Sequence, residues 1–344
     1  MNTSIRGCST LAAIVMFVFL LLGGYPLEAS GVPYEINLSS RLLINSYNIL
    51  ADGCEVPDYV TPMRLDLQSD NGTFCALVIR EKVDKASPLY HIISSMKMGA
   101  AEKKQLLRNI TDGTLIIYFD AGARPDRLLN NRMIFEAELE RAGFSKSDIK
   151  PDFIVLSHSH NGEIVALQEA LPNTPVFVTL DMKNGIVLED RTIPIKNKVI
   201  LKPGVTPLTD HISLISTVFQ MAPPTKVIQK GQIFNRKKDS SDPPEYESAL
   251  AVNTRDGVAL FGTCMHCSFL GVVKTAMKFY RKDIILYCGG FENDSSAIPK
   301  ALKLSPSMEF YLHHCAPVES LQWKYGESRI HRIRLGERVL INPY

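Results

Sequence analysis

"DFIVLSHSHNGEIVALQEAL", residues 152–171, joins a strand-like run to a helix-like run through two histidines. The apolar run 153–156 predicts a buried strand, and the apolar residues after the histidines recur at helical spacing up to Leu171. His158 and His160 lie at the junction. In an extended chain, residues two positions apart project to the same side, so both imidazoles can reach one cation. The stretch predicts a β–α unit with two candidate metal ligands at the end of its strand; the alternative is two polar residues in an ordinary turn.

Further strands are predicted where short apolar or alternating runs are bounded by Gly, Pro, Asn or Asp. These runs are residues 74–79, 115–119, 176–180, 199–201, 249–252, 258–261, 284–287 and 310–312. Helical spacing predicts a helix that ends at Gly143, a second that ends before Pro172, and a third over residues 272–280. Strands and helices interspersed in this way predict an α/β layered sandwich.

Two segments are interpreted as additions to this domain. Residues 81–114 separate two strands that would otherwise form a hairpin, so we interpret them as an insertion, with a short helix over residues 101–107. Residues 230–247 are polar and rich in Pro, which predicts a surface loop. Long loops inside a compact domain often cover a functional site.

The N-terminal sequence is typical of a secretory signal peptide. Arg6 precedes an unbroken apolar run over residues 11–22, and small residues follow up to Gly31. We therefore expect residues 1–30 to be removed, which leaves one domain over residues 31–344 in a secreted or periplasmic protein. A retained signal would instead anchor the chain to a membrane.

Two further features bear on export. Four N-x-S/T triplets beyond the expected signal peptide predict a glycoprotein if the source is eukaryotic; they begin at Asn37, Asn71, Asn109 and Asn293. Six cysteines follow the expected cleavage site: Cys54, Cys75, Cys264, Cys267, Cys288 and Cys315. An oxidising compartment allows disulfides between them, but the spacing does not give their pairing.

The composition is that of an ordinary globular protein. Of the 344 residues, 45% are hydrophobic and 22% are charged, and the formal net charge is +2. This balance gives no signature of nucleic-acid binding, and the sequence contains no Gly-rich phosphate loop or dinucleotide motif. We expect a small-molecule substrate or ligand, no nucleic-acid partner, and no stable membrane span after cleavage.

Several motifs together resemble the metallo-β-lactamase superfamily. The family carries H-x-H-x-D-H after a strand, where this chain has HSHNGE at residues 158–163. The FDAG turn at residues 119–122 is similar to the family's F-D-T-G turn, and His266 lies where the family places a third histidine. The strand end at residues 286–294 and the pair His314-Cys315 resemble the dihydropterin-(ribofuranosyl)aminobenzene-phosphate synthase-like branch.

The resemblance implies an αββα metallo-β-lactamase sandwich with a metal site at one edge of its sheets. His158, His160 and His266 match the histidines that hold one zinc in active relatives, and a fourth position left to water would keep such a site open. Bound metals activate a water molecule and stabilise charge on an attacked carbonyl or phosphoryl oxygen. We therefore expect about one zinc ion per chain.

The second metal site of the family is altered in this chain. Gly162 stands where the family has Asp, Glu163 where it has His, and Glu292 where a later His is usual, whereas His314 is kept. Glu163, Glu292 and His314 are the candidate ligands for a second cation. Glu163 and Asp120 are the catalytic candidates, with Asp120 expected to accept hydrogen bonds that hold the loops of the site.

Three functions are compatible with these residues. The chain is a metal-dependent hydrolase, or a catalytically weakened relative that binds a small molecule or partner in the old cleft, or an interaction protein whose histidines hold no metal. Bound metal is expected from the first two and not from the third.

The altered motif predicts that the wild-type protein binds at most one zinc ion tightly. Replacing Gly162→Asp together with Glu163→His should add a second site, because an Asp and an imidazole would again stand beside Glu292 and His314. Zinc titration under native mass spectrometry measures the stoichiometry of both proteins. Two tightly bound zinc ions in the wild type would show that Glu163 or Glu292 already replaces the lost ligands.

Overall fold

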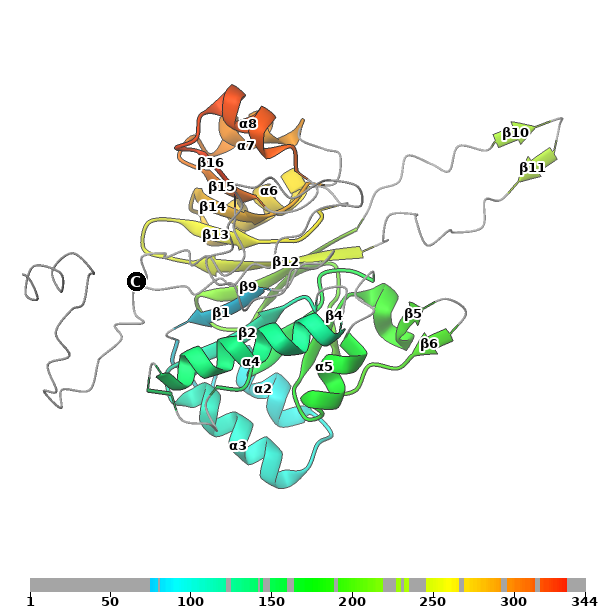
Figure 1. Ribbon diagram of the computed structural model, residues 1–344, viewed down its shortest axis with the longest axis vertical. Helices are drawn as coiled ribbons and strands as arrows, with labels where there is room; N and C mark the ends of the chain where they lie inside the picture. Colours follow the sequence, from blue (N-terminus) through cyan, green and yellow to red (C-terminus); the bar gives the residue numbers. More distant parts are fainter. Residues whose placement is uncertain are drawn as a thin grey trace, which may run out of the picture. The chain divides into compact units, whose positions relative to one another are not determined.

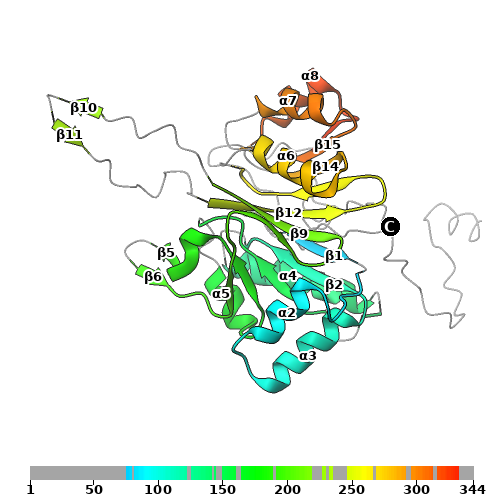
Figure 2. The ribbon, with the colours of Figure 1, turned by 180° about the vertical axis from the view of Figure 1, so that it is seen from behind.

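The computed structural model describes residues 75–79, 81–121, 125–141, 143–144, 149–159, 164–188, 191–218, 227–229, 232–234, 246–265, 269–291, 296–312 and 316–332. Within these residues the chain forms two main sheets that face each other and carry helices on their outer faces (Figures 1 and 2).

The first sheet has five strands in the order β1-β2-β3-β4-β7. They are β1 (Cys75–Ile79), β2 (Leu115–Phe119), β3 (Phe153–Val155), β4 (Val176–Val178) and β7 (Lys198–Ile200). β1 is antiparallel to β2, and the other neighbours are parallel. The carboxyl ends of β2, β3 and β4 therefore lie at the same edge of the sheet.

The second sheet has seven strands in the order β16-β15-β14-β13-β12-β9-β8. They are β8 (Gly204–Pro207), β9 (Ile212–Val218), β12 (Tyr246–Asn253), β13 (Val258–Phe261), β14 (Ile284–Gly289), β15 (Glu309–Leu312) and β16 (Ile330–Arg332). β13 to β16 are mutually parallel, so their carboxyl ends also share one edge. Two short pairs stand apart from these sheets: β5 (Ile186–Leu188) with β6 (Arg191–Ile193), and β10 (Val227–Gln229) with β11 (Gln232–Phe234).

Helices follow many of the strands. They are α2 (Pro88–Ser95), α3 (Ala100–Thr111), α4 (Pro125–Arg141), α5 (Ile164–Ala170), α6 (Phe269–Tyr280), α7 (Ala297–Leu304) and α8 (Val318–Tyr325), with a 3₁₀ turn η2 (Leu180–Asn184). α4 and α5 pack on the outer face of the first sheet, and α6, α7 and α8 pack on the outer face of the second.

Alternation along the strands explains this layering. In β2, Ile117 and Phe119 point into the core between the sheets, whereas Ile116 and Tyr118 point out beneath α4. Both faces of the strand are buried and apolar, as is usual for parallel strands covered by helices. Phe135 of α4 contacts Tyr118 edge-on, with ring centroids 6.1 Å apart.

The predicted αββα sandwich is confirmed, as are the predicted strands, whose bounds agree to within a few residues. The helices predicted before Gly143, before Pro172 and near residues 272–280 are also confirmed. β9 was not predicted, although it pairs with β12 over seven residues in the middle of the second sheet.

The two segments interpreted as additions differ from expectation in detail. Residues 81–114 lie between the antiparallel neighbours β1 and β2 and contain α2 and α3, of which only the second was predicted. The surface loop predicted at residues 230–247 is wrong at both ends, because β11 lies within it and β12 begins at Tyr246. Glu247 is consequently buried, with 1% of its surface exposed.

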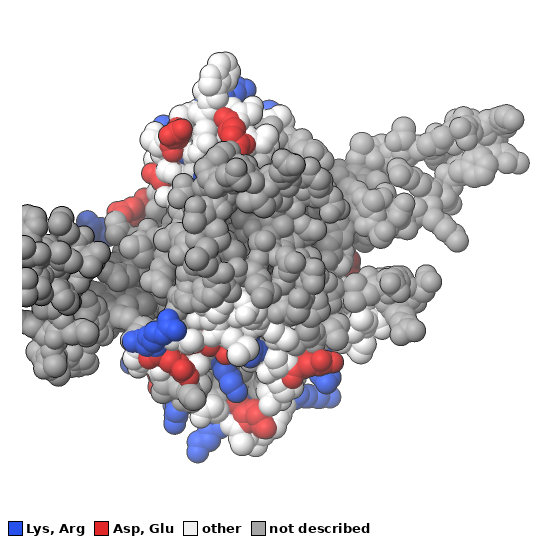
Figure 3. Space-filling view, viewed as in Figure 1, with Lys and Arg blue, Asp and Glu red and all other residues white. Residues whose placement is uncertain are grey.

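Among the described residues, no helix is long and apolar enough to cross a membrane. On the face shown in Figure 3, Lys and Arg side chains are interspersed with Asp and Glu side chains over the helices beside the first sheet.

Gly289, at the end of β14, has no room for a side chain. A Cβ atom there would lie 2.3 Å from Oη of Tyr287 and 2.9 Å from the carbonyl oxygen of Gly262, and Tyr287 is fully buried. We expect Gly289→Ala to lower the free energy of unfolding by about 1–3 kcal/mol, since neither neighbour can move away. Urea unfolding followed by circular dichroism measures the change.

Gly99→Ala is the matched control. Its added Cβ would meet only the carboxylate end of Glu102, an exposed side chain that can rotate away. We expect a loss below about 1 kcal/mol. Equal losses in the two variants would contradict the close packing at Gly289.

Candidate metal centre

Asp120 lies directly after β2 in an unusual backbone conformation. Its φ is 61°, in the left-handed region, which Asp tolerates better than most residues. Its backbone N–H donates to the carbonyl of Val155 at 2.8 Å, and only 1% of its surface is exposed. The turn therefore directs the Asp120 carboxylate into the interior at the carboxyl edge of the first sheet.

The Asp120 carboxylate accepts two hydrogen bonds from Ser157, which follows β3. The backbone N–H of Ser157 donates to Oδ1 at 2.7 Å, and its hydroxyl donates to Oδ2 at 2.7 Å. The same hydroxyl oxygen lies 2.6 Å from Nδ1 of His158 and 2.6 Å from Oγ1 of Thr263. Thr263 follows β13, so this cluster joins the carboxyl edges of the two sheets.

When Asp120 is ionised, the hydrogen bonds of this cluster determine which ring nitrogen of His158 carries a proton. The one hydroxyl proton of Ser157 is used toward Asp120 when that carboxylate is ionised. The 2.6 Å contact with Nδ1 of His158 then requires the proton to be on Nδ1. A histidine that is protonated at Nδ1 carries its lone pair on Nε2, the atom through which such a ring can bind a metal ion.

Burial raises the pKa of Asp120 from 3.8 to about 7. Hydrogen bonds from Ser157 and Thr263 act in the opposite direction, and the negative charge of Glu247 adds to the increase. The carboxylate is therefore held in a site where ionisation is costly, and the donors around it offset only part of that cost.

The loops after β13 and β14 are tied together beside this cluster. The backbone N–H of Gly290 donates to the carbonyl of Thr263 at 2.5 Å, and the hydroxyl of Tyr287 donates to the carbonyl of Gly290 at 2.9 Å. Burial raises the pKa of Tyr287 well above its ordinary value, with the charge of Glu247 as the second cause, so its hydroxyl stays a donor. Met265 also adopts a left-handed φ, of 49°, at the position before His266.

The structure places two of the predicted site residues together. His158 and Asp120 are both buried and linked through Ser157. The other candidates lie outside the described residues: His160, Glu163, His266, Glu292 and His314. Among the described residues, no group of three His, Cys, Asp or Glu side chains is arranged to hold a metal ion.

Ser157, Thr263 and Glu247 are site residues that the sequence did not reveal. Ser157 lies inside the quoted stretch, next to His158, but a serine in a turn carries no pattern of its own. Thr263 and Glu247 come from other strands, and only the fold brings them to Asp120.

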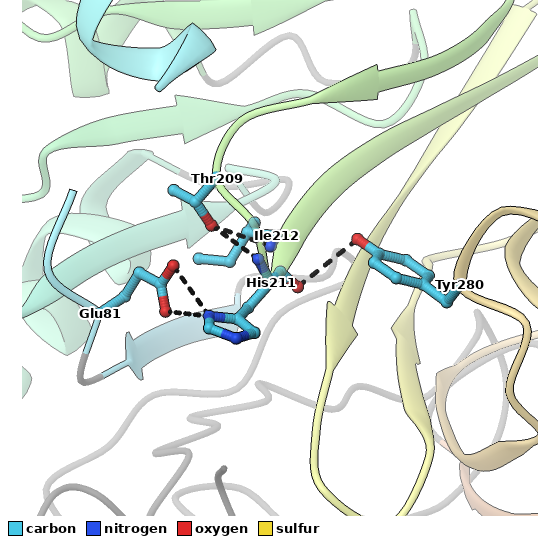
Figure 4. A network of polar contacts seen from close by, with 5 residues as sticks. All are labelled: Glu81, Thr209, His211, Ile212 and Tyr280. Carbon is cyan, nitrogen blue, oxygen red and sulfur yellow. Dashed lines mark hydrogen bonds and ion pairs between the residues drawn. The ribbon is translucent and has the colours of Figure 1, made fainter. Parts of the chain in front are cut away.

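His211 forms its hydrogen bonds outside the candidate centre. Its Nδ1 lies 2.9 Å from Oε2 of Glu81, and its carbonyl accepts from the hydroxyl of Tyr280 at 3.5 Å (Figure 4). The hydroxyl of Thr209 accepts from the backbone N–H groups of His211 and Ile212. His211 therefore ties the segment after β1 to the β8–β9 turn.

A pocket of about 500 Å³ lies between α2 and α3 and contains no predicted site residue. Four of its lining residues are cationic: Lys85, Lys103, Lys104 and Arg108. Two of these have partners, because Nζ of Lys103 donates to the carbonyl of Ser94 at 2.9 Å and Arg108 lies 4.0 Å from Asp112. The candidate centre is therefore at the strand ends and not in this pocket.

No family model matches the sequence, and no curated protein sequence matches it. Among solved structures, the chain is similar to a metal-dependent hydrolase of the β-lactamase superfamily. The identity is 13% and the TM-score 0.49, with 87% of this chain and 98% of that chain covered.

Two further solved structures are similar. For the metallo-β-lactamase fold protein YhfI from Bacillus subtilis, the identity is 11% and the TM-score 0.36, with 65% and 87% covered. For a metallo-β-lactamase from Cronobacter sakazakii, the identity is 12% and the TM-score 0.33, with 80% and 91% covered. At TM-scores below 0.5 these similarities assign no residue role and no reaction to this chain, whose own contacts are the basis of the proposal below.

The raised pKa of Asp120 makes stability depend on pH. Between pH 3.8 and about 7 the folded protein holds a proton on Asp120 that the unfolded chain releases, so the free energy of unfolding falls as pH rises through this window. Over the window the loss attributable to Asp120 is about 4 kcal/mol, from roughly 1.4 kcal/mol per pKa unit.

The variant Asp120→Asn has no titrating group. Its amide oxygen can still accept from the backbone N–H of Ser157, whereas its NH2 group is a donor toward the Ser157 hydroxyl, as the protonated acid would be. We expect the stability difference, wild type minus variant, to fall between pH 4 and about pH 7.5 and then to stay constant. Urea unfolding of chelator-treated proteins measures it. A difference that does not change with pH would show that Asp120 is ionised throughout the range.

Proposed function

We propose that this chain is an exported metal-dependent hydrolase with one zinc ion held by His158, His160 and His266. The observation that carries the proposal is the Asp120–Ser157–His158 hydrogen-bond chain, which is buried and holds the His158 ring through its Nδ1 atom. A metal-binding histidine is commonly held in this way through its other ring nitrogen, which fixes its tautomer and orientation.

The fit to a zinc ion is supported by the chemistry and position of the donors. Three imidazoles are typical zinc ligands, and His266 follows Met265, whose loop is joined through Thr263 to Ser157. The ends of β3 and β13, which precede His160 and His266, are thus held at one edge by a 2.6 Å contact. When bound, a zinc ion supplies Lewis acidity, which activates water and polarises a carbonyl or phosphoryl oxygen.

The chain's own residues have separate tasks in this proposal. Asp120 accepts from the Ser157 hydroxyl and so positions His158 without touching the substrate. Glu163 is assigned to proton transfer, because a carboxylate next to the ligand histidines can accept a proton from water. Glu163, Glu292 and His314 would be the ligands of a second cation if one binds.

The second candidate is a catalytically weakened relative that binds a small molecule at the same edge. It is favoured by Gly162, which has no side chain to ligate a cation, orient water or accept a proton. The two candidates differ in turnover. If the chain is a hydrolase, the zinc-loaded wild type cleaves generic ester or phosphodiester probes faster than the His158→Ala variant. If the chain is a weakened relative, the two proteins cleave these probes at the same rate.

The tris-histidine assignment predicts that the ligands act as a unit. We expect His158→Ala and His266→Ala each to lower the affinity for zinc by at least about tenfold, since each removes one of three ligands. Inductively coupled plasma mass spectrometry of protein purified without chelator gives the stoichiometry, and circular dichroism verifies the fold.

His211→Ala is the matched control, because His211 pairs with Glu81 and is not assigned to the metal. It should retain the wild-type zinc content. Full zinc in His266→Ala would remove the third ligand from the proposal, and no zinc in the wild type would overturn the metal-dependent function.

A further inference from the structure

Two buried thiols face each other across the sandwich. Cys75 begins β1 of the first sheet, and Cys288 lies in β14 of the second. They are 4% and 3% exposed and belong to the same core cluster between the sheets. Burial raises the pKa of the Cys75 thiol, and the neighbouring Cys288 thiol raises it further through hydrogen bonding and through its charge. Two thiols that lie far apart in the sequence are thus neighbours in the core between the sheets, where the structure contains both as free cysteines.

The position of this thiol pair relates it to the candidate centre. Cys75 pairs in register with Phe119, the residue before Asp120. The carbonyl of Cys288 accepts from the backbone N–H of Gly262 at 2.9 Å, one residue before Thr263. A bond between the two sulfur atoms would therefore join β1 and β14, which pair with the strands that precede Asp120 and Thr263.

We propose that Cys75 and Cys288 form a disulfide that links the two sheets at the base of the candidate centre. Each thiol loses a proton, and the pair gives two electrons to an oxidant of the disulfide class, such as oxidised glutathione, which becomes two thiols. The reaction proceeds through a mixed disulfide with one cysteine, which the second then displaces. The expected export of the chain supplies an oxidising environment.

Burial sets the order of events. Neither sulfur is accessible in the folded chain, and burial raises the pKa of the Cys75 thiol well above its ordinary value. A protonated, inaccessible thiol exchanges slowly, so the bond forms before the sheets close completely and then resists reduction. The cross-link is independent of the proposed metal site, because neither thiol is assigned to zinc.

Peptide mapping of the full wild-type chain tests the pairing directly. The protein is refolded in a mixture of reduced and oxidised glutathione, unfolded, alkylated at free thiols and digested. We expect a Cys75 peptide joined to a Cys288 peptide, two hydrogen atoms lighter than the reduced peptides together, which disappears after reduction. Both cysteines alkylated as free thiols, or either one joined to another cysteine, would overturn the proposal.

Thermal unfolding with and without a reductant gives a second readout. Closing a loop of roughly 200 residues restricts the unfolded chain, so full reduction should lower the Tm of the wild type by roughly 5–10 °C. Cys264→Ser is the matched control, since Cys264 is partly exposed and outside the pair, and it should show the same shift. The double variant Cys75→Ala, Cys288→Ala should show none; an equal shift there would contradict the cross-link.

Discussion

The hydroxyl group of Ser157 connects three parts of the molecule that are far apart in the sequence. Its oxygen contacts Asp120 after β2, His158 after β3 and Thr263 after β13 at 2.6–2.7 Å. All of these residues are almost fully buried, so each polar atom depends on the others for hydrogen bonds that water cannot supply. Most of the contact between the sheets is apolar. Ser248 of β12 adds a hydrogen bond from its backbone N–H to the carbonyl of Ser157 at 2.8 Å. Because hydrogen bonds are directional, these contacts require one registration of the first sheet against the second. The geometry of the candidate centre follows from that registration.

The sequence predicted the layers of this fold because both faces of the central strands are apolar. Runs such as residues 115–119 are bounded by turn residues and are too short for helices, so they could only be buried strands. β9 was not predicted because Ser213 and Ser216 interrupt its apolar run, although both serines are buried. The hydroxyl of Tyr280 in α6 donates to Ser213 at 2.7 Å and offsets the cost of burying it. That compensation comes from a helix far along the chain and leaves no local pattern to read.

The candidate centre was predictable in part for a related reason. Strand ends can be located from apolar runs, which placed His158 at the end of a strand. Asp120 was identified instead from the resemblance of residues 119–122 to a known motif. Glu247 could not be found in this way, because it lies in a polar stretch that resembles a loop, and it is buried only because β12 extends into that stretch. Its effect on the pKa of Asp120 acts through space and not along the chain. Sequence patterns therefore located the edge but not the electrostatics within it.

The cluster around Ser157 joins the two sheets through hydrogen bonds between protein groups. The Ser157 hydroxyl contacts Thr263 after β13, and the backbone N–H and hydroxyl of Ser157 both donate to Asp120 after β2. The Asp120 carboxylate thus holds both the backbone and the hydroxyl of Ser157, and the same hydroxyl contacts Nδ1 of His158. A substitution at Asp120 or Ser157 should therefore disturb the position of His158 together with the contact between the two sheets.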